Sequence, residues 1–184
     1  MTTEEKICQA LLAEMEHENV ATIKVKDLIK RAGISRSTFY NHYSSVQDVM
    51  EDLEMRLFSD IPANSGTIEE YLKDRKQLHE LILVKFAYIK AHLREFQALT
   101  GPNGDPYFQY HLGRFFLPEL QQFENRGESV QLTLANEGLN GARMSIISWW
   151  IRHPNQISLE ELADFLTDFL TSYIIFIKNK RSQP

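Results

Sequence analysis

The stretch KDLIKRAGISRSTFYNHY, from Lys26 to Tyr43, decides the fold of the first part of the chain. Apolar residues at helical spacing lead up to Gly33, and a second short segment of polar and aromatic residues follows it. Two short helices joined by a tight turn that contains glycine form a helix-turn-helix. Gly33 suits the turn because glycine adopts positive φ angles at little cost. The stretch therefore predicts a helix-turn-helix.

The second helix of this pair, from Ser35 to about His42, is rich in side chains that can donate hydrogen bonds. Base edges and phosphate oxygens are recognised through hydrogen bonds, and the major groove of DNA admits one helix. We expect the following residues to contact DNA: Lys24, Lys26, Ser35, Arg36, Ser37, Thr38, Tyr40, Asn41 and His42. From the pattern alone, an ordinary surface helical hairpin is the alternative, and the two lysines can equally be solvated.

The charge of the chain is unevenly distributed around this stretch. The whole chain of 184 residues has a net charge of −5, yet between Thr22 and Tyr43 the only acid is Asp27. The basic residues in that segment are Lys24, Lys26, Lys30, Arg31 and Arg36. A basic strip of this kind suits a phosphate backbone, but it can also be a solvated face. The charge alone leaves both interpretations open.

Helical spacing recurs along the whole chain, and no long strand-like alternation occurs. The sequence therefore predicts an all-α fold of about nine helices. Residues 1–45 form the predicted helix-turn-helix DNA-binding domain, and 46–184 form a helical effector-binding and dimerisation domain. A helix over 46–60, opened by Ser45 and Asp48, links the two, and the break IPANSG at 61–66 follows it.

The second half is predicted to contain several longer helices. One runs from Thr67 into the nineties, and an aromatic-rich helix follows the turn cluster TGPNGDP at 100–106. Two more run from about Ser129 to His153 and from Ser158 to about Lys178, the last opened by a capping box.

Composition limits the class of protein. The single cysteine excludes an intramolecular disulfide, and the acidic N-terminal segment is not a signal peptide. No apolar run approaches the roughly 18 residues that span a bilayer. We expect a soluble, cytoplasmic protein without a membrane partner.

From Ile7 to Leu53 the sequence resembles the N-terminal domain of the TetR family of bacterial transcriptional regulators, through VKDLIKRAGISRSTFYNHYSSVQDVMEDL at 25–53. The segment GARMSIISWWIRHPNQISLEELADFL at 141–166 resembles regulators of this type from low-GC Gram-positive bacteria. The close match covers about a quarter of the chain. The resemblance implies a homodimer with one three-helix DNA-binding domain per chain. It also implies that the fourth helix leads to a divergent ligand-binding domain.

The resemblance also assigns roles within the second helix of the pair. Tyr40 and His42 correspond to phosphate contacts, whereas Arg36, Ser37 and Asn41 face the groove as base readers. An arginine can pair with a guanine through two hydrogen bonds, which contributes about 1–3 kcal/mol of discrimination.

Several positions depart from the family pattern or have an open role. Val46 replaces a lysine that often meets phosphate, and Lys24 stands where a threonine often caps the second helix, with Thr22 as a possible substitute. Thr38 either contacts phosphate or helps its helix to begin. Tyr43 matches a core aromatic and is excluded from the site.

The last two helices carry apolar stripes that the resemblance assigns to a four-helix bundle across a two-fold axis. The predicted dimer residues are Leu139, Ile146, Trp149, Trp150, Leu162, Leu166, Phe169, Tyr173 and Ile177. The alternative is that these residues form the core of a single chain.

Aromatic residues of the middle helices are candidates for an effector pocket, because such pockets are mostly apolar. The predicted pocket residues are Phe86, Phe96, Tyr107, Tyr110, His111, Phe115 and Met144. Each of them can equally be a core residue, and no ligand class follows from them.

No enzymatic site, metal site or cofactor is predicted. The segment HELILVKF at 79–86 lacks the second histidine of a zinc helix, and no glycine-rich phosphate loop or GxSxG motif occurs. Cys8 fits a small core residue.

The sequence thus predicts a dimeric transcriptional regulator, a repressor that binds a near-palindromic operator of double-stranded DNA and is released by an unknown small-molecule effector. One alternative is an activator or co-regulator of the same fold that a partner protein controls. Another is a degenerate DNA-binding domain that serves only as an interaction module.

Overall fold

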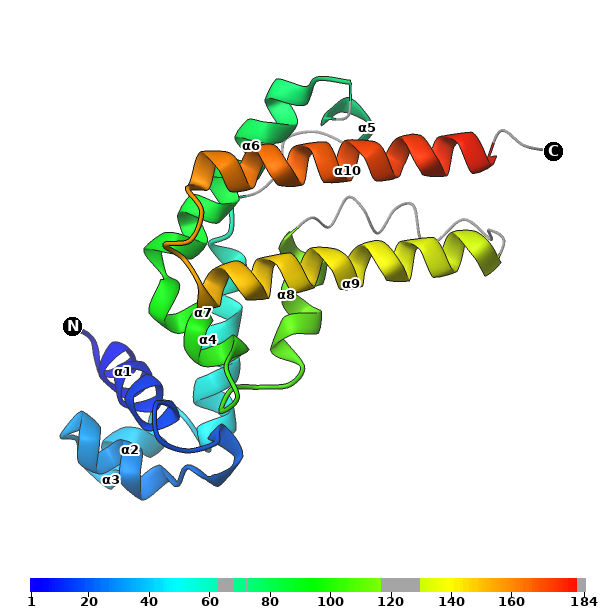
Figure 1. The fold of residues 1–184 in the computed structure, drawn as a ribbon. Coiled ribbons are helices and arrows are strands. Elements are labelled where there is room, and N and C mark those ends of the chain that lie inside the picture. Colours follow the sequence, from blue (N-terminus) through cyan, green and yellow to red (C-terminus); the bar gives the residue numbers. More distant parts are fainter. Residues whose placement is uncertain (63–67, 72, 117–129, 182–184) are drawn as a thin grey trace. The chain divides into compact units, whose positions relative to one another are not determined.

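The described part of the chain folds into helices and connecting loops, which confirms the predicted all-α class. The structure, a computed structural model, describes residues 1–62, 68–71, 73–116 and 130–181 (Figure 1). These ranges contain ten α-helices, one more than expected, and a short 3₁₀ helix, η1 (Val20–Thr22). Two compact units result. The first comprises Met1–Asp60 and Arg94–Tyr110, and the second comprises Ile61–Leu93 and His111–Pro184.

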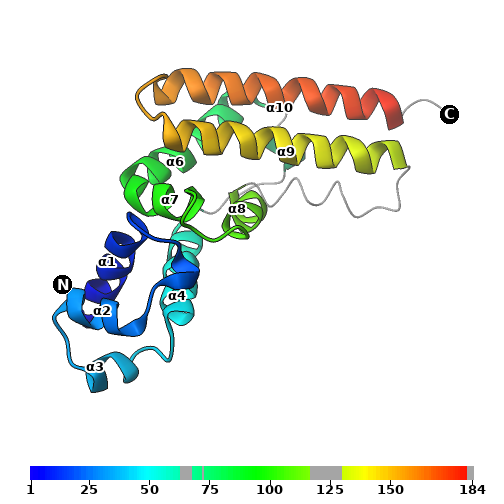
Figure 2. The same ribbon diagram turned by 60° about the horizontal axis from the view of Figure 1, so that its bottom comes forward.

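The first unit is built around four helices close to the predicted positions: α1 (Thr3–Met15), α2 (Val25–Ala32), α3 (Arg36–Tyr40) and α4 (Val46–Ser59). Figure 2 shows α1 to α4 grouped together. Helix α1 packs against both α2 and α4. The fully buried side chains at the centre of this group include Ile7, Leu11, Leu28, Phe39 and Val49. Their burial holds the helix-turn-helix together, because apolar area removed from water stabilises by about 25 cal/mol per Å².

Local signals fix where these helices begin and end. Gly33 has φ 65° and ψ 35°, the left-handed conformation that ends α2. Ser35 begins α3 by accepting a hydrogen bond from the backbone N–H of Thr38 at 3.0 Å. Lys24 precedes α2 without a side-chain cap, and the Thr22 hydroxyl donates to the carbonyl of Asn19 instead. The expectation that Thr22 could cap α2 in place of Lys24 is therefore wrong.

A segment distant in sequence completes the first unit. It contains α7 (Leu93–Thr100), the turn that follows, and the start of α8 (Phe108–Phe116). The Asn103 amide donates to the carbonyl of Met15 at 2.9 Å, and the N–H of Val20 donates to the carbonyl of Asn103 at 2.9 Å. The ring of Phe108 stacks on that of Phe58 with centroids 5.2 Å apart. The turn cluster thus satisfies the backbone at the end of α1.

The second unit contains α5 (Ile68–Tyr71), α6 (Arg75–Ala91), α9 (Val130–Arg152) and α10 (Leu159–Arg181). Helices α9 and α10 lie side by side in Figures 1 and 2, and α10 packs extensively on α6. Phe86 of α6 meets the fully buried Trp150 of α9 edge to face, with centroids 5.1 Å apart. The predicted capping box of Ser158 and Glu161 is present, and it starts α10.

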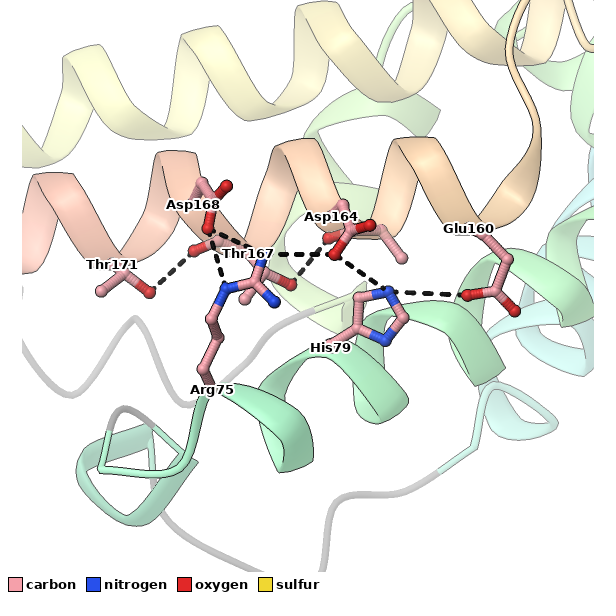
Figure 3. Close-up of polar contacts among 8 residues, drawn as sticks. Arg75, His79, Glu160, Asp164, Thr167, Asp168 and Thr171 are labelled. Carbon is pink, nitrogen blue, oxygen red and sulfur yellow. Dashed lines mark hydrogen bonds and ion pairs between the residues drawn. The ribbon is translucent and has the colours of Figure 1, made fainter.

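Ion pairs join α6 to α10 (Figure 3). Arg75 donates to Asp168 at 3.0 Å and to Asp164 at 3.1 Å. The Nε2 atom of His79 lies 3.5 Å from Asp164 and 3.6 Å from Glu160. The three acids follow each other at i, i+4 spacing, so one face of α10 pairs with the first turns of α6. Arg75 and the three acids are exposed, so these pairs add little to stability.

The single long helix predicted from Thr67 into the nineties is wrong. Asp74 accepts hydrogen bonds from the N–H groups of Lys76 and Gln77, at 3.0 and 3.3 Å, and so begins α6 after the short α5. Aspartate favours helix N-caps over helix interiors, which explains the break. His92 has φ −114° and ψ 32°, outside the helical region, and separates α6 from α7. No helix in the described ranges is long and apolar enough to cross a membrane.

Candidate nucleic-acid interface

Helix α3 presents polar side chains on its outer side and an anchor on its inner side. Phe39 is fully buried, and its ring meets Tyr40 edge to face with centroids 5.5 Å apart. The exposed members of the predicted contact set are Lys24, Lys26, Ser35, Arg36, Ser37, Tyr40, Asn41 and His42, and Thr38 is half-buried. The predicted contacts from α3 and the residues next to it therefore gather around one short, anchored helix.

Hydroxyl groups cluster at the start of α3. The Ser35 hydroxyl lies 2.8 Å from that of Ser37 and 2.7 Å from that of Thr38. Because Ser35 also caps the helix, these hydroxyls hold the first turn in shape. The position of Thr38 fits the second of its two predicted roles, support for the start of the helix.

Arg36 and Tyr40 form a pair on the exposed face. The guanidinium carbon of Arg36 lies 5.5 Å from the centroid of the Tyr40 ring, within the range of a cation–π contact. Tyr40 is 47% exposed, so its hydroxyl stays accessible while its ring supports the arginine. The arrangement suits a planar cation presented to base edges beside a phenol presented to phosphate.

His42 follows α3 and carries an unexpected partner. Its Nδ1 atom lies 2.8 Å from Oε1 of Glu4 in the first turn of α1. The pKa of Glu4 is lowered, first by the hydrogen bond from its own backbone N–H and then by Thr2, with smaller contributions from His42. The carboxylate is therefore ionised near neutral pH. The separation of 38 positions between the two residues explains why no local pattern indicated this pair.

Other charged and polar residues of the same unit bind partners within the unit. Arg31 of the basic strip donates to Glu14 at 2.6 Å, so part of its charge is neutralised. Tyr43 is buried as expected, and its hydroxyl donates to Asp52. The burial, and after it this hydrogen bond, raise the pKa of the phenol. Val46 is buried and therefore presents no group to a phosphate.

The predicted pocket residues are distributed over both units. Phe86 and Phe96 are fully buried in ring-to-ring contacts with Trp150 and Phe108, which is the core role that their spacing left open. The exposed side chains are Tyr107 and Tyr110, and the half-buried ones are His111 and Met144. The side chain of Phe115 lies outside the described residues.

A cleft of about 290 Å³ opens in the first unit between α1 and the α7 segment. Buried Leu12 and Met15 line it, and the Arg94–Glu16 ion pair of 2.8 Å stands at its edge. None of the aromatic residues predicted as a pocket lines this cleft. No local pattern indicates this cleft, because its two walls come from segments about 80 residues apart.

The predicted dimer residues divide into a buried and a more accessible group. Those buried within their own unit are Leu139, Trp150, Leu162 and Leu166, so their side chains form core. Trp149 is exposed, while Ile146, Phe169 and Tyr173 are half-buried. Phe165, which was not predicted, is exposed and stacks with Phe169 at 6.3 Å. The side chain of Ile177 lies outside the described residues.

Comparisons with known proteins add one likeness. No protein-family model and no curated protein matches the sequence. Among solved structures, the chain is similar to the TetR family repressor AlkX from Dietzia sp. strain DQ12-45-1b, described as implicated in biodegradation of n-alkanes. The TM-score is 0.43 at 17% identity, and the similarity covers 91% of this chain and 95% of that chain.

Proposed function

We propose that the chain is a cytoplasmic, DNA-binding transcriptional regulator that works as a homodimer. The observation that carries the proposal is the geometry of α3. Phe39 anchors its inner side, and Gly33 forms the turn between α2 and α3. Arg36 and Tyr40 are exposed on α3, and Asn41, also exposed, ends it. Such a helix fits the major groove, and its donors match base edges and phosphate oxygens.

The proposed dimer places two α3 helices on one duplex, so the operator is near-palindromic. The exposed aromatic side chains Trp149 of α9 and Phe165 of α10 support a partner surface on the second unit. The action we propose is repression. An effector that binds within 46–184 relieves it, because the bound protein shifts toward a conformation with weaker operator affinity. Equal operator affinities with and without a bound effector would contradict this last step.

The test is selection from a random pool of duplex DNA. The native protein should enrich a near-palindromic motif, whereas an Arg36→Ala/Tyr40→Ala variant should enrich none. A Lys90→Ala/Tyr107→Ala variant serves as the matched control, because it also removes one cation and one exposed tyrosine, both distant in sequence from α3. It should enrich the same motif as the native protein. A native protein that enriches nothing even at low salt would contradict autonomous DNA binding.

A further inference from the structure

The pair formed by His42 and Glu4 joins an imidazole just after α3 to a carboxylate in the first turn of α1. The imidazole Nδ1 and the carboxylate oxygen are 2.8 Å apart, which is a hydrogen-bond distance. Because the Glu4 carboxylate can only accept, Nδ1 must carry the proton that is shared between them. The contact therefore selects the tautomer of the neutral His42 ring in which Nδ1 carries the hydrogen.

This tautomer has a consequence for the other ring nitrogen. When the ring is neutral and Nδ1 holds the proton, Nε2 has a lone pair and no hydrogen. A nitrogen with a lone pair and no hydrogen repels a phosphate oxygen and cannot donate a hydrogen bond to it. His42 can therefore hold a phosphate through Nε2 only when both ring nitrogens are protonated.

A phosphate bound at Nε2 would be a second anion beside the ring, opposite Glu4 at Nδ1. Glu4 alone would place a negative charge close to the phosphate backbone, and the imidazolium neutralises it. The neighbouring charges on α4, Asp52 and Arg56, pair with each other at 2.6 Å and contact Tyr43. On α3 the nearest charge along the chain is Arg36, which lies over Tyr40. Glu4 is thus the acid that faces His42 directly.

We propose that Glu4 positions His42 as a proton-dependent phosphate clamp, so that each protomer takes up a proton when it binds DNA. The inference rests on the proposed DNA-binding function and assigns Glu4 a positioning role in it. The sign follows from linkage. A complex that needs protonated His42 is strongest at low pH and weakens as pH rises through the range in which histidines titrate, about 5 to 8.

The test measures Kd by fluorescence anisotropy from about pH 5.5 to about pH 8.5. The probe is the motif enriched in the selection, or a mixed-sequence duplex at low salt. For the native protein, Kd should rise by up to about tenfold per pH unit for each protomer. His42→Gln should remove that part of the slope. Glu4→Gln should flatten it, because an amide can also donate to Nδ1 and then lets the neutral ring carry its proton on Nε2. His17→Gln, which removes an exposed histidine beyond the far end of α1, should behave as the native protein does.

A second measurement does not depend on how well the variants fold. Nitrogen NMR of the His42 ring in the native complex should find both ring nitrogens protonated at a pH at which the free protein has a neutral ring. A neutral ring in the complex, or a His42→Gln profile parallel to the native one, overturns the inference while DNA binding stands. A native protein that binds no duplex at any pH in the range overturns the proposed function itself.

Discussion

Arg36 combines two properties that lysine does not share, a planar guanidinium and support from an aromatic ring. The stacking on Tyr40 restrains the guanidinium before any base is met, so less conformational entropy is lost on binding. A flexible lysine ammonium at this position keeps the charge but cannot form two parallel hydrogen bonds with one guanine. An arginine at position 36 can therefore contribute to base specificity, whereas a lysine would contribute only to general DNA affinity.

Arg36→Lys should therefore keep general DNA affinity and lose about 1–3 kcal/mol of discrimination at one base pair of each half-site. The measurement is competition between the selected motif and its single-base variants. Lys30→Gln, which removes an exposed base of α2 outside the predicted contacts, should leave the base preference unchanged. Equal discrimination by the native and Arg36→Lys proteins would show that Arg36 contacts only the backbone.

Glu54 of α4 is an acid inside the first unit, 6% exposed. Burial raises its pKa to about 7, and the carboxylates of Asp105 and Glu51 add to that effect. The folded protein therefore holds the proton more tightly than the unfolded chain does. Stability should fall as pH rises from about 4.5, the ordinary glutamate value, to about 7.

Glu54→Gln should raise the free energy of unfolding at pH 8 by on the order of 2 kcal/mol, because it removes the cost of the buried charge. The gain should vanish below about pH 4.5, where the native side chain is protonated in both states. Urea denaturation at several pH values measures this difference. Glu51→Gln, an exposed acid of α4, should change stability by less than about 0.5 kcal/mol. A destabilised Glu54→Gln protein at pH 8 would contradict the account.

At the scale of elements, the turn between α2 and α3 depends on the conformation of Gly33 and not on a lack of space. A Cβ atom at Gly33 would meet no other atom within 4 Å, yet the φ of 65° is strained for residues with a side chain. Gly33→Ala should destabilise the protein by about 1–2 kcal/mol, and Gly33→Asn by less, because asparagine tolerates this conformation better. Chemical denaturation compares the three proteins. An alanine variant as stable as the native protein would show that the turn relaxes.

Elements whose signals are local could be predicted from sequence, while contacts between distant elements could not. Gly33, Ser35 and Ser158 act within a few residues, so the end of α2 and the starts of α3 and α10 were predicted closely. The hydrogen bond from Asn103 to Met15 joins positions 88 residues apart, and the periodicity of the sequence does not indicate such a contact.

The same reason limits the predicted site. The polar face of α3 could be inferred from its residue types, because the side chains that can donate hydrogen bonds follow one another within a single short segment after Gly33. The partner of His42 depends on how α1 packs, and the exposure of Phe165 depends on which face of α10 its own unit covers. Both require the tertiary structure.

At the scale of the whole molecule, the proposed homodimer depends on the exposed aromatics of the second unit. Trp149→Glu and Phe165→Glu should each raise the dimer dissociation constant by about 30-fold or more, because each buries a charge at a cost of at least about 2 kcal/mol. Sedimentation at matched concentrations measures the change. Tyr107→Glu, which changes an exposed aromatic of the first unit, should leave the dimer intact. If neither Trp149→Glu nor Phe165→Glu changes the dimer dissociation constant, the dimer interface lies elsewhere.

The first unit is discontinuous in sequence, and a fragment ending at Asp60 lacks part of it. Such a fragment loses the Asn103 contacts to Met15 and Val20 and the stacking of Phe108 on Phe58. The amide protons at the end of α1 should then exchange at least about tenfold faster than in the full chain. Hydrogen exchange measured on both proteins checks this. Equal protection would mean that residues 1–60 are sufficient.

That discontinuity also determines when the unit can be completed in a cell. Domains fold during synthesis as their residues emerge, at about 5–20 residues per second. The first 60 residues must wait for Tyr110 before the unit is whole, a delay of about 3–10 seconds. A newly made chain would therefore complete the unit that contains α3 only after more than half of the protein has been translated.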